Sequence, residues 1–152
     1  MFETIFSVIQ IIFSAEARAE KKRQRQIEAT RLVGAELKNL ANLFSFVLEA
    51  TDSNGNIKPE MTDELVALRI RNWNQWVSIL SSGAYELLEQ TDREEIGAII
   101  EVTSAAPGDY INEIFLIQKA ESEGKIPIEV RAQFSGSISR LRNKAAQLRL
   151  AA

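Results

Sequence analysis

Large apolar side chains are distributed unevenly along the first fifty residues. Residues 2–13 carry eight of them, residues 14–26 carry none, and they then return at helical spacing. The later apolar stripe consists of Val33, Leu37, Leu40, Phe44 and Val47. Steps of four and three keep these side chains on one face of a helix. No Gly or Pro precedes Gly34, and the first group of helix-breaking residues is TDSNGNIKPE at 51–60. The pattern therefore predicts one helix from about residue 2 to about residue 50, roughly 70 Å long.

The remainder of the chain shows further helical patterns separated by Gly and Pro. Pro59 is expected to begin a helix that ends near Gly83, followed by a short helical piece at 84–90. Three more helices are predicted at 91–102, at 109–123 and from Pro127 onward. The last has an apolar seam formed by Phe134, Ile138, Leu141, Ala145 and Leu148. No alternating run or hairpin signal is visible, so the sequence predicts that the chain contains no sheet.

These elements predict an all-α protein. Its domain at 30–152 is expected to be a bundle of four or five helices, beyond which the first helix projects at its N-terminal end. Thr91 lies three residues before Glu94, a spacing that predicts a capping box at the start of its helix. The two Trp residues, Trp73 and Trp76, lie one turn apart and are expected to fill the core.

Composition narrows the classes of function. The chain of 152 residues contains no Cys and no His, which removes thiolate catalysis, the commonest general base and the usual transition-metal ligands. The net charge of −3 is segregated, with +2 at 1–48, −10 at 49–129 and +5 at 130–152. No phosphate-binding Gly loop is present. The sequence therefore favours a non-enzymatic protein without a metal or other cofactor.

One loop has a spacing that resembles a calcium-binding loop. Asp52, Asn54 and Asn56 match the first, third and fifth positions of an EF-hand. Ile57 stands where that loop needs Gly, and Asp63 where it needs a bidentate Glu. The mismatch favours a simple Asn-Gly turn between two helices.

Two clusters of charged residues are candidate sites. The acidic positions Glu86, Glu89, Asp92, Glu94, Glu95, Asp109 and Glu113 are interpreted as helix-terminal charges and a solvated face. The basic positions Arg140, Arg142, Lys144 and Arg149 could add to those of the first helix in binding nucleic acid. Because no aromatic residue is interleaved for base stacking, nucleic acid is a disfavoured partner.

The apolar N-terminal segment, residues 1–14, is the most informative feature. Its apolar part reaches about 18 Å, too short for an ordinary crossing of a hydrocarbon core of about 30 Å. A signal peptide is disfavoured because its first residues should be basic, whereas this chain has Glu3 there and no Lys or Arg. Three environments remain: folding back onto the bundle, contact with a membrane, and burial in an oligomer or a partner protein. The charged segment that follows, residues 15–29, contains no helix breaker and argues against folding back.

Three sets of candidate contact residues follow from helical spacing. The membrane or oligomer contacts are Phe2, Ile5, Phe6, Ile9, Ile12 and Phe13. Glu3, Ser7, Gln10 and Ser14 form a narrow polar line on the same helix. The candidate anionic-lipid contacts are Arg18, Lys21, Lys22, Arg23 and Arg25.

The sequence thus predicts a membrane-associated helical bundle that forms a homo-oligomer through its N-terminal helix and scaffolds or permeabilises a membrane. The basic charge after the apolar segment places the bundle in the cytoplasm. The alternative is a soluble cytoplasmic adaptor or regulator whose apolar helix docks into a groove of a partner protein. The layout of residues 1–50 resembles that of small bacterial membrane-tethered proteins in general, a likeness that implies no activity.

Overall fold

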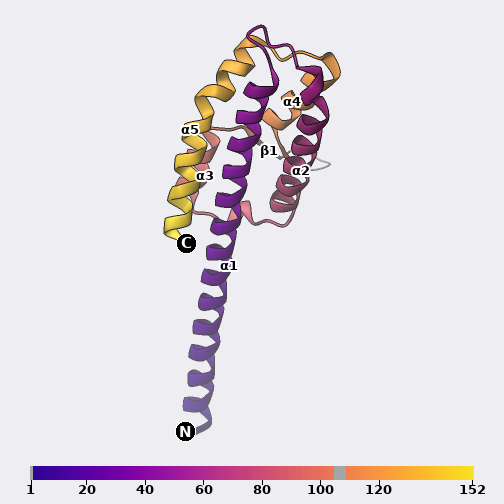
Figure 1. The fold of residues 1–152 in the computed structure, drawn as a ribbon. Coiled ribbons are helices and arrows are strands. Elements are labelled where there is room, and N and C mark those ends of the chain that lie inside the picture. The colour runs from indigo at the N-terminus through magenta and orange to yellow at the C-terminus, as the bar shows by residue number, and fades with distance from the viewer. Residues whose placement is uncertain (1, 105–108) are drawn as a thin grey trace.

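A single helix, α1 (Phe2–Ala50), runs through the centre of the fold and extends far beyond it at one end (Figure 1). The structure is a computed structural model that describes residues 2–104 and 109–152, with the side chains of 4–103 and 110–152. The later helices are α2 (Thr62–Ser81), α3 (Gln90–Gly97), α4 (Asn112–Glu123) and α5 (Ile128–Ala151). Two 3₁₀ helices, η1 (Pro59–Met61) and η2 (Tyr85–Leu87), precede α2 and α3. The predicted all-α bundle with a long projecting N-terminal helix is confirmed.

Helices α1 and α5 pack side by side in opposite directions and form the main part of the core (Figure 1). The rings of Phe44 and Phe134 stack between them with centroids 4.3 Å apart and planes 3° from parallel. Near the other end of the contact, Gly34 lies against Leu148, where a Cβ on Gly34 would be 3.3 Å from the Leu148 Cβ. All five residues of the predicted stripe on α1 are buried, as are four of the five on α5. The steps of four and three therefore predicted the buried face of each helix, whereas the pairing of α1 with α5 was not predicted and comes from the structure.

The turn after α1 docks against the segment that joins α4 to α5. The Gly55 carbonyl accepts a hydrogen bond from the Ile126 N–H at 2.8 Å, and the Ile57 N–H donates to Gly124 O at 3.0 Å. Gly55 adopts a φ of +85°, which the predicted Asn-Gly turn requires. The Asp52 carboxylate accepts the Asn56 and Asn54 N–H groups within this turn, and these bonds lower the pKa of Asp52. The carboxylate of Asp52, which matched the first ligand of a calcium loop, thus accepts hydrogen bonds from the backbone of its own turn.

The exclusion of a sheet was wrong. Strands β1 (Val102–Ser104) and β2 (Asp109–Ile111) pair antiparallel, with Val102 opposite Ile111 and Thr103 opposite Tyr110. Asp109 consequently lies in a strand, and the helix predicted to begin there begins instead at Asn112. Strands of three residues are too short for an alternating pattern to be recognised.

The predicted capping box on α3 is also wrong. Thr91 lies inside α3, whose N-cap is Glu89, and no side chain caps this helix end. Of the two tryptophans, Trp76 is fully buried, while Trp73 is half-buried and stacks on Tyr110 with centroids 6.0 Å apart. The expected core role therefore holds fully for Trp76 and in part for Trp73.

Candidate functional site

The part of α1 that projects from the bundle is exposed throughout. Every described side chain from residue 4 to residue 25 is exposed, and Ala29 is the first buried residue of the described part of α1. Figure 1 shows this part of the helix extending away from the bundle. Seven large apolar side chains of this part are between 43 and 68% exposed: Ile5, Phe6, Val8, Ile9, Ile11, Ile12 and Phe13. The apolar segment does not fold back onto the bundle of the same chain. That alternative is therefore contradicted, because a continuous helix carries the segment away from the core.

The distribution of these side chains around the helix is asymmetric. At 100° per residue the apolar positions cover an arc of roughly 220°, and the polar line occupies the remainder. Ser7, Gln10 and Ser14 share one face, where they line a shallow groove with Ile11 and Arg18. Phe2 and Glu3 lie outside the described side chains. None of the described helices combines the length and the apolar content needed to cross a membrane.

The charged segment continues the polar line as a line of cations. Arg18, Lys21 and Arg25 follow Ser14 at steps of four, three and four, which keeps them on the same face of the helix. Arg23 differs from the other candidates because its guanidinium pairs with Glu20 at 2.8 Å. Hydrogen bonds from Gln24 and then Arg23 lower the pKa of Glu20. Among the described residues, the other four candidate cations have no ion pair.

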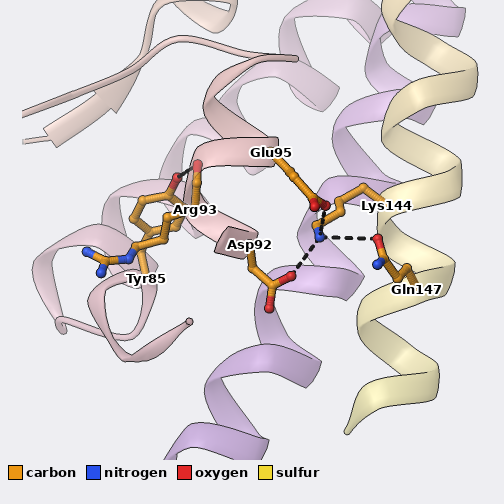
Figure 2. Close-up of polar contacts among 6 residues, drawn as sticks. All are labelled: Tyr85, Asp92, Arg93, Glu95, Lys144 and Gln147. Atoms are coloured by element: carbon orange, nitrogen blue, oxygen red, sulfur yellow. Dashed lines mark hydrogen bonds and ion pairs between the residues drawn. The ribbon is translucent and has the colours of Figure 1, made fainter. Parts of the chain in front are cut away.

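Inside the bundle, a buried lysine joins α5 to α3. Lys144 is only 4% exposed, and its Nζ lies 2.7 Å from Asp92 Oδ1, in contact with Glu95 and 3.2 Å from Gln147 Oε1 (Figure 2). Burial lowers the pKa of Lys144, but the hydrogen bonds to Asp92 and Glu95 outweigh it and the pKa is raised. Because Lys144 is buried and paired with two carboxylates, it is not accessible to a nucleic acid, unlike the prediction that grouped it with Arg140, Arg142 and Arg149.

A second ionisable side chain, Glu113, is buried as well. It lies in the first turn of α4, as the helix-terminal interpretation predicts, but the prediction of a solvated face is wrong for it. Its carboxylate accepts the backbone N–H of Glu101 at 3.1 and 3.3 Å. Burial raises the pKa of Glu113 more than this hydrogen bond lowers it. Because Glu101 directly precedes β1 and Glu113 lies in the first turn of α4, the contact holds the strand pair against α4.

These polar contacts are structural and do not resemble a reaction centre. No group of three or more potential metal-ligating side chains is found within the described part of the chain. Comparison of the chain with protein-family models, with curated proteins and with solved structures found no match. The exposed helix is consequently the feature on which a function can be argued.

Sequence reasoning located the exposed helix but missed the polar contacts within the bundle. Lys144 follows Leu141 and precedes Ala145 and Leu148, so its position at the edge of the apolar seam was the available signal. Nothing in the sequence indicated which carboxylates it would meet, since Asp92 lies 52 positions away.

Proposed function

We propose that this protein is a non-enzymatic, membrane-associated helical bundle that attaches to an anionic membrane surface and self-associates there through its N-terminal helix. The observation that carries the proposal is the exposure of seven large apolar side chains on a helix that points away from the bundle. Full burial of one such side chain stabilises by about 1.5–3 kcal/mol. Seven half-exposed ones could therefore supply on the order of 5–10 kcal/mol toward association.

The order of segments supports lipid as the first contact. An apolar segment too short to span can lie at the boundary between headgroups and acyl chains, where an amphipathic helix buries its apolar arc. Arg18, Lys21, Lys22 and Arg25 follow it within about 20 Å of helix. Each cation near an anionic surface adds roughly 1 kcal/mol of attraction. The bundle then lies on the cytoplasmic side, the side that basic flanking residues favour.

Self-association is supported by the polar line. A helix that is apolar around most of its circumference buries its remaining polar side chains best against copies of itself. Ser7, Gln10 and Ser14 would then face one another, and in the strongest form of the proposal they line a polar lumen that permeabilises the bilayer.

Vesicle flotation tests the proposal. The full-length protein should float with vesicles that contain anionic lipid, and less with neutral vesicles or at high salt, because screening shortens the reach of the cations to about 3 Å at 1 M. The variant Phe6→Gln/Phe13→Gln should not float. The matched control is Phe115→Gln, which changes an exposed aromatic residue on α4 instead. Full-length protein that stays with the unbound fraction at low salt would overturn membrane attachment.

Two further measurements separate the forms of the proposal. Sedimentation velocity should show oligomers that a mild detergent changes in size. Release of trapped dye at saturating binding would support the permeabilising form, and intact vesicles would remove it. The alternative, an adaptor whose helix docks into a partner protein, predicts a monomer that ignores vesicles and loses partner capture when residues 2–14 are deleted.

A further inference from the structure

A cleft of about 410 Å³ lies on the bundle, away from the exposed helix. Its wall is formed by the end of α2, by η2 and α3, and by the start of β1. Leu80, Ile100 and Val102 contribute apolar surface, and Tyr85 and Arg93 contribute the polar groups on which the argument rests. This volume falls in the range that small-molecule sites occupy.

Arg93 is the one cation that lines this cleft, and it has no acidic partner among the described side chains. Its Nε is buried without any hydrogen-bond acceptor. A buried donor left without an acceptor is unfavourable, because it has lost its hydrogen bonds to water without replacement. Figure 2 shows Arg93 on the side of α3 opposite the Lys144 cluster, running past Tyr85. The guanidinium is therefore held in the cleft with part of its hydrogen-bonding capacity unused.

Tyr85 fixes the local geometry of Arg93. Its hydroxyl donates to the Arg93 carbonyl oxygen at 3.3 Å, which ties η2 to α3. Burial raises the pKa of Tyr85, so the phenol is neutral at physiological pH and adds no negative charge beside the guanidinium. Its ring supplies a flat apolar wall. An aromatic or branched apolar group could pack there while an attached anion meets Arg93.

We propose that this cleft binds a small apolar monocarboxylate, with Arg93 as the carboxylate-binding residue. A guanidinium binds a carboxylate through two parallel N–H···O bonds, and among the described residues lining the cleft Arg93 is the one cation that can supply them. The apolar body of the ligand lies against Leu80, Ile100 and Val102.

Two acidic side chains at the cleft limit the negative charge that a bound ligand can carry. Glu86 and Glu101 line it as well, both are exposed, and neither forms an ion pair with Arg93 within the described part of the chain. Together with Arg93 they leave the cleft with a net charge of −1. This field opposes every anion, and it opposes a dianion such as phosphate more strongly than a single carboxylate that can pair directly with Arg93. Removal of either acid should therefore strengthen binding.

Sodium benzoate is the probe, titrated into the full-length protein at constant ionic strength. Binding is followed by titration calorimetry in every variant and, where Arg93 is retained, also by the NMR signal of the Arg93 Nε–H. We expect saturable binding by the wild type, weakened about tenfold in Arg93→Gln because the guanidinium is lost, and strengthened in Glu86→Gln because a like charge is removed from the cleft. Arg142→Gln, an exposed arginine on α5, is the matched control and should bind like the wild type.

A second variant keeps the test decisive if Arg93→Gln fails to fold. Gly97 lines the cleft one helical turn after Arg93, and a Cβ added there would meet nothing within 4 Å. Gly97→Leu therefore places a bulky side chain in the cleft while Arg93 keeps its charge. It should abolish the benzoate-induced shift. An unmoved signal in the wild type, equal binding by Gly97→Leu, or phosphate bound as tightly as benzoate would each overturn the proposal.

Discussion

The Nζ of Lys144 on α5 lies 2.7 Å from the Oδ1 of Asp92 on α3, although the two residues are 52 positions apart in the chain. The lysine is almost fully buried, whereas Asp92 is partly and Glu95 about half exposed. α3 is a helix of eight residues with a single fully buried side chain, Ile96. A contact of this kind therefore fixes a short helix that has little apolar surface of its own.

Replacing Lys144 with Ala should lower the free energy of unfolding by about 1–3 kcal/mol. The loss stays below that of a fully buried pair because water can reach the two carboxylates left behind. Urea unfolding followed by tryptophan fluorescence measures it. Lys119→Ala, an exposed lysine on α4, is the control and should change stability by less than about 0.5 kcal/mol. Equal stability of the two variants would show that the contact is dispensable.

Two buried glutamates predict how stability depends on pH. Burial raises the pKa values of Glu113 and Glu36 above 4.5. The folded state therefore holds these protons more tightly than the unfolded state. Their contribution is fully present below pH 4.5 and is lost as the pH rises through the raised values. Glu113→Gln should be at least as stable as the wild type at neutral pH and should lose less stability between about pH 4.5 and 7.

The midpoints of urea unfolding, measured across that pH range, test whether stability falls with rising pH as predicted. Glu113→Gln keeps an oxygen that can accept the Glu101 N–H, whereas Glu113→Ala leaves this donor without its acceptor and should be less stable at every pH. A wild type and a Glu113→Gln variant with the same pH profile would contradict the assignment of the raised pKa to Glu113.

The stacked pair in the core predicts a large effect of truncation. Phe134→Ala removes the ring that lies 4.3 Å from that of Phe44 and should cost about 3–5 kcal/mol. Phe115→Ala, at a residue that is 49% exposed, should cost well under half of that. Thermal or urea unfolding measures both. Similar losses for the two variants would mean that α1 and α5 do not pack as described.

Two glycines with positive φ should respond differently to a methyl group. Gly55→Ala and Gly83→Ala both place a Cβ on a left-handed residue, which costs roughly 1 kcal/mol. At Gly55 the new Cβ would also lie 2.2 Å from Ile126 O, whereas at Gly83 it would meet nothing within 4 Å. Gly55→Ala should therefore be the less stable variant by more than about 1 kcal/mol, as judged by urea unfolding.

Deletion of residues 2–24 should leave the stability of the bundle unchanged within about 0.5 kcal/mol. The reason is that the described side chains in this stretch are all exposed. Calorimetry of the shortened protein, with the full-length protein in mild detergent as reference, checks this. A lower unfolding temperature after deletion would indicate that the segment supports the bundle.

The sequence determined the long helices. α1 was predicted from Phe2 to Ala50 because strong helix formers fill this stretch and the first breakers follow it, and α5 because its apolar seam has helical spacing. The contrast between the apolar segment and the charged segment likewise marked the candidate site. Its exposure could be anticipated, since no breaker allows the chain to turn back. These are local properties, because helix propensity and the spacing of apolar residues depend on residues close together in the chain.

Tertiary structure decided everything that depends on residues far apart in the chain. The pairing of Val102 with Ile111 needs few residues and leaves no periodic signal. The capping box predicted at Thr91 does not form because the N-cap of α3 is Glu89, two residues earlier. The packing of α3, α4 and α5 decides three further features. It determines the partners of Lys144, the burial of Glu113 and the absence of a hydrogen-bond partner for the Arg93 Nε among the described residues. Charge along a sequence does not reveal partners, because an ion pair forms only where packing brings two side chains within about 4 Å.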